Sequence, residues 1–558
     1  MSDLLHPVPV ARRRRPTERG RVLKGIALAV AMICALPMLA VLITALSGGT
    51  DTIAHLSQTV LPRYAGTTLL LVVLVSVGTF ALGVGAAWLV TMTRFPGVRV
   101  FEVALVLPLA FPAYVLAYAY THVLDHPGIV QTSLRAATGW GPRDYWFPDV
   151  RSVGGAAVML ILVLYPYVYL LARAAFLQQS ATTFLAARAL GANAWSAFFK
   201  ISLPMARPAI AGGVLLAVME TIADFGTVAY FGVQTFATGI YTSWFSLADR
   251  GGAAQLALCL LSFALLLAFL ERAQRGKAKY HDTARGQHRM NAMPLRGAAA
   301  VMAVMLCAVP VVLGAVLPVV ILFSMGLGSE QDLLSPRYVG FVQNSLTLAS
   351  IAALCTVAAA IAVGFFQRLH PGRLSFGSGY VARLGYAVPG GVIAVGLLVP
   401  FAAFDNALDG FMRAQFDIST GLLITGSIWL LVAAYMVRFL AAALGAYEGG
   451  QALVPMNMDA AARSLGQTPI GTLRRVHLPI LAPSLLTALL IVFVDVMKEL
   501  PATLIMRPFN FDTLAVQAYR LASDERLEGA AVPSLVIVAI GLLPVVLICR
   551  QVGRHHSK

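Results

Sequence analysis

The sequence predicts an all-α polytopic membrane protein with about twelve transmembrane helices in two tandem six-helix halves. Of its 558 residues, 59% are hydrophobic and only 12% are charged, which is too little polar surface for soluble domains of this length. Apolar runs of roughly 18 residues or more recur from end to end, and in lipid such runs satisfy their backbone groups as helices. In addition, one sequence element occurs twice, 275 positions apart.

Twelve apolar runs define the expected helices. They cover residues 22–46, 66–92, 100–121, 153–176, 207–231, 252–271, 297–324, 343–366, 380–405, 420–445, 483–506 and 530–550. A basic tail, 1–21, precedes the first half, 22–271. A charged linker, 272–296, leads to the second half, 297–550, and a short tail, 551–558, ends the chain.

The net charge of +16 indicates membrane orientation rather than a nucleic-acid ligand. If the N-terminus is inside, the even connections are cytoplasmic and hold an excess of Lys and Arg, as the positive-inside rule expects. These basic residues are Arg94, Arg99, Arg173, Arg188, Lys200, Arg207, those of 272–296, Arg368, Arg373, Arg438, Arg463, Arg474, Arg475, Arg550, Arg554 and Lys558. The sequence therefore predicts a multi-pass protein of the bacterial inner membrane with both termini in the cytoplasm.

No enzyme site stands out in the chain. A phosphate-binding loop needs Gly-x4-Gly-Lys-Ser/Thr, but the sole Gly-Lys pair, Gly276-Lys277, has Glu271 and Ala278 at the positions of the first glycine and the hydroxyl. The chain is therefore expected not to be an ATPase, and no cofactor is expected.

The repeated element lies in a connection expected on the cytoplasmic side. Its first copy runs from Leu185 to Pro204 and its second from Ala460 to Pro479. In each copy an alanine and a glycine four positions apart share one helix face, where small side chains let another backbone approach closely. Because each half holds an even number of helices, the halves have the same orientation and are related by an axis along the membrane normal.

The pattern Ala-Ala-x-x-x-Gly-x9-Ile-x-Leu-Pro resembles the coupling motif of permeases of ATP-binding-cassette (ABC) importers. The resemblance implies the type I importer permease fold, with coupling helices at about 184–204 and 459–479 that dock on a separate ATP-binding subunit, a dimer. The motif residues are Ala186, Ala187, Gly191, Leu203, Pro204, Ala461, Ala462, Gly466, Leu478 and Pro479. The leading glutamate of the motif is replaced by Leu185 and Ala460, although Asp459 lies one residue earlier. The alternative is an ordinary amphipathic connecting loop.

Carboxylates follow each coupling motif within an expected membrane helix. Glu220 and Asp224 are four residues apart, as are Asp495 and Glu499, and Lys498 accompanies the second pair. Ionisable residues at this depth cost at least ~2.5–3.5 kcal/mol and usually face a water-filled path or a partner. These five residues are therefore candidates for a translocation path, where a ring of carboxylates suits a hard cation. The alternative is that they stabilise the helix bundle.

Further segments resemble the permeases of ferric-iron importers, in which two halves are fused. They are Asp224-Phe-Gly-Thr-Val-Ala-Tyr-Phe-Gly232, Met497-Lys-Glu-Leu-Pro-Ala-Thr503, Arg507-Pro-Phe-Asn-Phe-Asp-Thr-Leu-Ala515, Pro112-Ala-Tyr-Val-Leu-Ala117 and Pro389-Gly-Gly-Val-Ile-Ala394. The resemblance implies a periplasmic binding protein that delivers ferric iron; it does not assign a metal site to the permease. Importers of thiamine, polyamines or phosphonates share the architecture and stay open as alternatives. A transporter driven by an ion gradient through the buried acids is the alternative from another class.

The binding protein is expected to dock on periplasmic surfaces. Arg63 and Arg337 occupy corresponding helix entrances in the two halves and are candidates to meet acidic groups on its two lobes. The segments 122–152 and 507–529 are further candidates. The alternative for the two arginines is anchoring at lipid headgroups.

Overall fold

The computed structural model describes residues 18–47, 50–179, 196, 198–275, 293–329 and 331–554. Its first half comprises α1 (Glu18–Ser47), α2 (Thr50–Thr59), α3 (Leu61–Met92), β1 (Thr93–Arg94), α4 (Val98–Ala104), η1 (Leu107–Ala110), α5 (Ala113–Leu124), α6 (Ile129–Thr138), α7 (Val153–Gln178), η2 (Phe198–Ser202), α10 (Leu203–Ala223), α11 (Gly226–Tyr230), α12 (Phe236–Tyr241), η3 (Thr242–Ser246) and α13 (Arg250–Arg275).

The second half repeats this order with small variations. It comprises β2 (Met293–Pro294), α14 (Ala298–Val311), η4 (Val312–Val316), α15 (Leu317–Leu327), α16 (Pro336–Leu369), α17 (Arg373–Leu384), η5 (Gly385–Ala387), α18 (Gly390–Phe416), α19 (Ile428–Gln451), α20 (Met456–Ser464), α21 (Pro469–Thr472), η6 (Leu473–His477), α22 (Leu478–Met497), α23 (Pro501–Met506), α24 (Leu514–Ser523) and α25 (Leu527–Arg554).

The predicted fold class is confirmed. Within the described residues, eleven helical segments are long and apolar enough to cross a membrane, and a bent pair, Val98–Ala110 with Ala113–Thr138, can supply a twelfth. Every expected helix has a counterpart, but the expected continuous helix 100–121 is wrong. It bends by 92° ahead of Pro112, which cannot donate a backbone hydrogen bond. The expected helix 380–405 is interrupted in the same way before Pro389.

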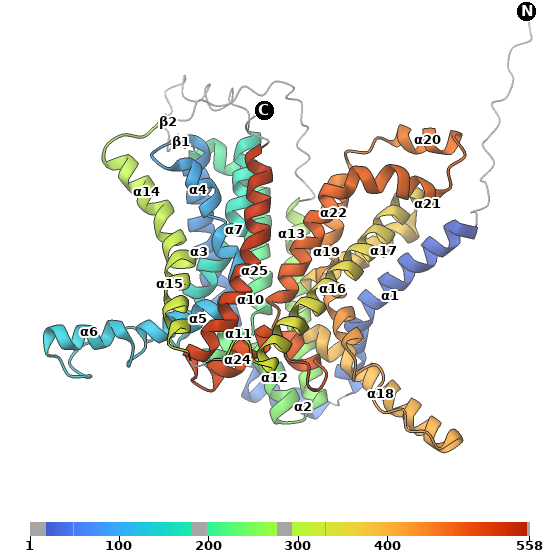
Figure 1. Ribbon diagram of the computed structural model, residues 1–558, viewed down its shortest axis with the longest axis horizontal. Coiled ribbons are helices and arrows are strands. Elements are labelled where there is room, and N and C mark those ends of the chain that lie inside the picture. The colour runs from blue at the N-terminus through green and yellow to red at the C-terminus, as the bar shows by residue number, and fades with distance from the viewer. Residues whose placement is uncertain are drawn as a thin grey trace, which may run out of the picture.

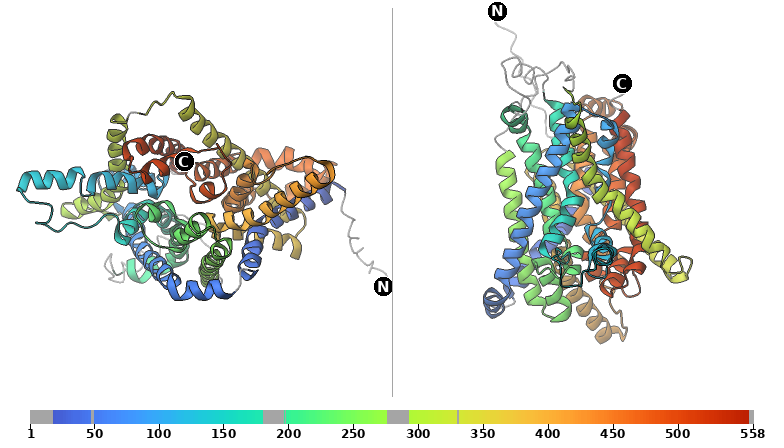
Figure 2. Two further views of the ribbon diagram at one scale, coloured as in Figure 1. Left: turned by 90° about the horizontal axis from the view of Figure 1, so that it is seen from below. Right: turned by 90° about the vertical axis from the view of Figure 1, so that its left-hand side faces the viewer.

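The halves exchange their first helices. Helix α1 packs on α16, α17 and α18 of the second half, while the helix formed by α14, η4 and α15 packs on α3, α4 and α5 of the first. Gly396 of α18 makes the first exchange possible, because a Cβ at this position would lie 2.3 Å from the carbonyl oxygen of Pro37. In the second exchange, the Tyr120 hydroxyl donates to the Leu313 carbonyl at 2.6 Å. The halves therefore form one interlocked bundle (Figure 2).

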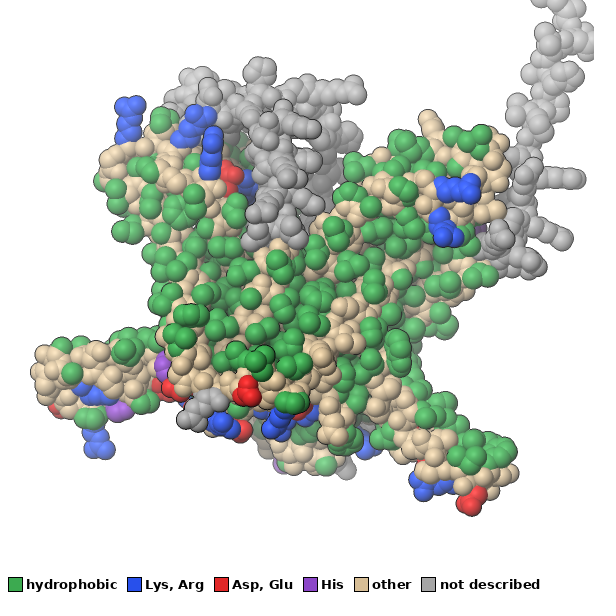
Figure 3. Space-filling view, in the orientation of Figure 1, with side chains coloured by type: hydrophobic (Ala, Val, Ile, Leu, Met, Phe, Trp, Pro, Cys, Tyr) green, Lys and Arg blue, Asp and Glu red, His purple; other side chains and the backbone are tan. Residues whose placement is uncertain are grey.

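The two ends of the bundle differ. One, here the α20 end, carries α20, α21 and the parallel β1–β2 pair, in which Thr93 lies opposite Met293. The other, the α6 end, carries α2, α6, α12, α24 and the tip of α18 (Figure 1). Helix α22 leans away from α25 toward the α20 end, so these two helices of the second half diverge there (Figure 1). Hydrophobic side chains cover the middle of the bundle and most charged ones lie near its two ends (Figure 3), as a bilayer requires.

The predicted linker, 272–296, is only partly described. Helix α13 continues to Arg275 before it, and Met293–Pro294 at its far end form β2. Residues 276–292 lie outside the described part of the chain, as do Ala186, Ala187 and Gly191 of the first coupling motif.

Candidate functional site

The five candidate path residues lie together in one cavity between the halves. Its lining includes Glu220, Asp224, Asp495, Lys498 and Glu499. The wall is completed by residues of η1, α5, α7 and α19. The structure thus brings together residues that the sequence separates by about half the length of the chain.

Two of the carboxylates do not lie within continuous helices, so the expected helices 207–231 and 483–506 are wrong in this respect. Helix α10 ends at Ala223, and Asp224 then accepts hydrogen bonds from the backbone N–H of Thr227 and Val228 at 3.1 and 3.2 Å. Glu499 accepts from the corresponding N–H groups of Ala502 and Thr503 at 2.9 and 3.1 Å. Both carboxylates therefore cap the short helix that follows, in the manner of a helix N-cap.

The remaining carboxylates, Glu220 and Asp495, face basic side chains of the second half. Lys498 Nζ lies 2.9 Å from Asp495 Oδ1. Arg438 Nη2 lies 3.8 Å from Glu220 Oε2, and the Tyr386 hydroxyl donates to Glu220 at 3.4 Å. Glu220 therefore has its counter-ion in the other half of the chain.

The charge pattern predicts that Arg438 lies in a cytoplasmic connection, and this prediction is wrong. It lies in the middle of α19, is buried, and has no hydrogen-bond partner for Nη1. Gly390 lets it approach the other acids, because a Cβ at position 390 would lie 2.7 Å from both Arg438 Nη1 and Glu499 Oε1. An arginine within the core of an expected helix was the signal available in the sequence.

The cavity therefore combines four carboxylates with two basic groups. Among the described residues, no three His, Cys, Asp or Glu side chains are grouped so that they could hold a metal ion. The arrangement instead has two capping carboxylates and two ion pairs. Each carboxylate thus has a compensating partner, either backbone N–H groups or a basic side chain.

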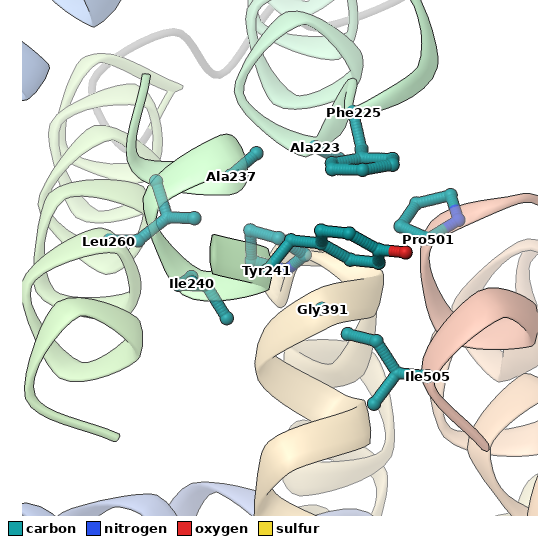
Figure 4. A pocket seen from close by; sticks show the side chains of 10 residues that line it. Ala223, Phe225, Ala237, Ile240, Tyr241, Leu260, Gly391, Pro501 and Ile505 are labelled. Atoms are coloured by element: carbon teal, nitrogen blue, oxygen red, sulfur yellow. The ribbon is translucent and has the colours of Figure 1, made fainter. Parts of the chain in front are cut away.

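An apolar layer lies beside the charged cavity, toward the α6 end. It is shown in Figure 4, where the Tyr241 ring of α12 points between Phe225 and Pro501, with Gly391 of α18 below it. The rings of Phe225 and Tyr241 are 4.6 Å apart, and Phe225 also lies 5.7 Å from the ring of Tyr519 in the second half. The contact of Phe225 with Tyr519 therefore joins the two halves beside the charged cavity.

The second coupling motif forms a surface helix at the α20 end. Ala461 and Ala462 lie in α20, Gly466 follows it with φ +76°, and Leu478 and Pro479 begin α22. In the first half, Leu203 and Pro204 likewise begin α10. A positive φ favours glycine, which explains the residue type at 466.

Asp459 fixes α20 to the bundle, although the leading glutamate of the coupling motif is replaced in this chain. Its carboxylate accepts from Arg368 Nε at 2.7 Å and lies 2.7 Å from His477 Nε2. Arg368 also donates to the Val454 carbonyl at 2.8 Å. Burial alone would raise the pKa of Asp459, but the hydrogen bonds from His477 and Arg368 lower it below its usual value.

The two candidate docking arginines occupy equivalent places. Arg63 lies in the first turn of α3 and Arg337 in the first turn of α16, and both are exposed. The Arg337 guanidinium also lies over the ring of Phe341, 5.7 Å from its centroid. Docking of the binding protein at these two arginines stays a prediction.

Two interlocked helical halves, a charged cavity between them and a surface helix at one end define a membrane transport permease. Comparison with known families identifies the family of this permease: residues 79–279 and 356–555 each match the binding-protein-dependent transport system inner membrane component. The chain belongs to this family. It is a multi-pass inner-membrane permease subunit of an ABC importer, and ATP hydrolysis and initial substrate capture belong to partner subunits.

Similar proteins differ in how much of this chain they match. The Fe(3+)-transport system permease protein FbpB 2 of Haemophilus influenzae is 24% identical over 523 residues, which is 92% of this chain and 95% of that protein. The molybdenum transport system permease protein ModB of Escherichia coli is 29% identical over 33% of this chain. The putative 2-aminoethylphosphonate transport system permease protein PhnV of Salmonella typhimurium is 28% identical over 38%.

Proposed function

We propose that the chain imports ferric iron that a periplasmic binding protein delivers. The observation that carries the proposal is the extent of similarity: the Fe(3+)-transport permease matches 92% of this chain, including both halves. The molybdenum and aminoethylphosphonate permeases match about a third of it. The segments around Asp224 and Glu499, which resemble ferric permeases in sequence, are also the ones that line the cavity.

The α20 end faces the cytoplasm in this proposal. The support is the excess of Lys and Arg in the connections at this end, together with the resemblance of α20 to a coupling helix. The two coupling elements receive the closing movement of an ATP-binding dimer. Asp459, Arg368 and His477 then transmit it, because they join α20 to α16 and to η6, which leads directly into α22.

Alternating access follows from the arrangement of the layers. In this proposal the aromatic layer, in which Phe225 contacts Tyr241 and Tyr519, is the barrier toward the α6 end, and α22 and α25 diverge at the α20 end. Closure of the ATP-binding dimer brings the diverging ends together and parts the aromatic layer. Substrate then enters from the binding protein, and the charged cavity spares it the cost of crossing hydrocarbon.

The charges of the cavity suit this cargo as mobile partners rather than as a fixed metal site. Glu220 and Asp495 are the carboxylates not occupied by backbone N–H groups in the hydrogen bonds described above, and each faces a basic group. A passing cation, or its complex, replaces Arg438 and Lys498 as the partner of these carboxylate oxygens. Hard cations prefer oxygen ligands, and weak, exchangeable binding lets the solute leave.

ATPase stimulation in nanodiscs tests the substrate. The permease is assembled with its ATP-binding subunit, and binding proteins loaded with ferric iron, thiamine, a polyamine, a phosphonate or molybdate are added in turn. Stimulation by the ferric-loaded protein, and not by the same protein without iron, is the expected result. Stimulation by one of the other loaded proteins alone would keep the importer class and reject ferric iron.

A further inference from the structure

Two arms leave the bundle on opposite sides near the α6 end (Figures 1 and 2). The first arm, residues 125–152, contains α6 and the segment that returns to α7. The second arm, residues 401–427, contains the outer part of α18 and the segment that returns to α19. They occupy the same position in the two halves, between the proline-interrupted helix and the helix that follows it.

Each arm is held together by polar contacts on one face of its helix. In the first, Arg135 Nη1 donates to the Tyr145 hydroxyl at 2.8 Å, and this hydroxyl donates to Gln131 Oε1 at 2.7 Å. In the second, Asp409 accepts from the N–H of Thr420 at 2.7 Å. Side chains four residues apart thus fix the return segment along one face of each helix.

In the second arm, a second carboxylate strengthens the same face. Asp405 accepts from the N–H groups of Ile424 and Thr425 at 3.1 and 2.8 Å and is buried by the segment it holds. The arms are therefore preformed structures and not loose connections.

The opposite face of each helix is apolar and uncovered. Ile129 and Val130 are 66% and 38% exposed on α6, and Phe404 and Phe411 are 52% and 56% exposed on α18. An exposed apolar stripe opposite a polar one is the pattern of a helix that lies in the membrane interface.

The position of these faces identifies what covers them. The return segment of the first arm lies below α6 in Figure 1, and the charged side chains of both arms lie on their lower sides in Figure 3, away from the membrane-spanning body. The apolar faces therefore point back toward the bilayer. In the second arm α18 runs unbroken from Gly390 in the bundle to Phe416, so its apolar surface continues that of the spanning region.

A tryptophan at the base of the second arm agrees with this position. Trp429 is 60% exposed where this arm returns to α19. Tryptophan is enriched at the boundary between hydrocarbon and water. We propose that the two arms are interfacial outriggers, whose apolar faces rest on the lipid of the leaflet at the α6 end and whose polar faces point to the aqueous side.

Spin-label accessibility in nanodiscs tests the outriggers on the full chain. The five native cysteines are replaced, retained transport is verified, and single cysteines are introduced as Val130→Cys and Phe411→Cys on the apolar faces. Arg143→Cys and Asn406→Cys, at exposed positions outside the apolar faces, serve as matched sites. Phe509→Cys, at a 93% exposed position in the segment between α23 and α24, reports the aqueous limit.

The proposal expects greater access to oxygen than to a water-soluble nickel chelate at positions 130 and 411, and the reverse at 143, 406 and 509. If 130 and 411 match 509 in the nickel measurement, the arms do not lie on lipid. If they match 509 in the free permease and become protected only when loaded binding protein is added, the faces belong to a protein interface and the outrigger proposal is wrong.

Discussion

The guanidinium of Arg151, in the first half, donates to both carboxylate oxygens of Glu525, in the second half, at 2.7 and 2.9 Å. Arg151 Nε also donates to Asp125 at 3.1 Å, and the guanidinium lies over the ring of Tyr230. This contact joins the halves near the α6 end, close to the aromatic layer. The proposed opening of the cavity toward that end requires this contact, here called the ionic latch, to break.

Breaking the latch is expected to favour the outward-open state. Because the Glu525 side chain is 60% exposed, the pair contributes about 0.5–1 kcal/mol, which corresponds to roughly a two- to fivefold change in the equilibrium. Glu525→Gln is therefore expected to raise the ATPase rate measured without binding protein by this factor. Arg143→Gln, an exposed substitution in the same segment as Arg151, serves as the control, and an equal rise in both variants would reject the latch.

The contacts of Asp459 that fix α20 to the bundle are expected to be needed for coupling to the ATP-binding subunit. Replacing Asp459 with Asn leaves buried Arg368 without its counter-ion, and loss of one partner from a buried pair costs about 3–5 kcal/mol. ATP-driven uptake should fall while binding of the ATP-binding subunit to the first half persists. Glu448→Gln removes a more exposed ion pair with Arg383 and should leave uptake near wild type. Normal uptake by Asp459→Asn would contradict this role.

The carboxyl group of Asp459 also makes the stability of the protein depend on pH. The pKa of Asp459 is lowered in the folded protein, so its contribution to stability is complete above the unfolded carboxyl pKa of about 3.9 and is lost as the pH falls through the lower folded value. The difference in Tm between wild type and Asp459→Asn is thus expected to be constant from about pH 6 to 8 and to shrink below about pH 4. A difference that changes between pH 6 and 8 would assign the titration to another group.

The paired acids of the cavity are expected to be needed for transport. Removing one charge about 4 Å from its partner costs more than ~1.4 kcal/mol at an effective dielectric constant near 20, so Glu220→Gln and Asp495→Asn should each reduce uptake more than about tenfold. Expression and Tm are measured in parallel. If both variants expressed normally and transported at the wild-type rate, the acids would serve only to hold the bundle together.

The two exposed arginines at the helix entrances provide a docking test. The double variant Arg63→Glu, Arg337→Glu is expected to weaken binding of the loaded binding protein to the permease in nanodiscs, measured by surface plasmon resonance, with a stronger effect at low salt. The double variant Arg99→Glu, Arg373→Glu, which makes the same change of charge at exposed positions of α4 and α17 outside the candidate docking segments, is the control. Unchanged affinity would leave only the lipid-anchoring interpretation.

Much of the fold was predictable from the sequence because its causes are local. Each spanning helix is marked by its own apolar run, and the duplication is visible in residue types such as Gly191 and Gly466. The interruptions at Asp224 and Glu499 were missed because apolar residues continue past them. In the second half Pro501 was the available signal, because proline cannot continue a helix and suits the first turn of a new one.

Contacts between the halves could not be predicted in this way. Glu220 meets Arg438, and Arg151 meets Glu525, across distances in the chain that no periodicity records. Asp459 was noted one residue from the expected position of an acidic group, but its partners Arg368 and His477 come from other helices. Such pairings depend on how the halves interlock and therefore require the three-dimensional structure.

The central claim is tested most directly by uptake of radiolabelled ferric iron into proteoliposomes that hold this permease and its ATP-binding subunit. ATP and the matching ferric-binding protein are supplied or withheld independently. The proposed function predicts uptake only when both are present. Uptake of another substrate but not iron under these conditions would contradict the ferric assignment, and iron uptake driven by a proton gradient without ATP would contradict the importer mechanism.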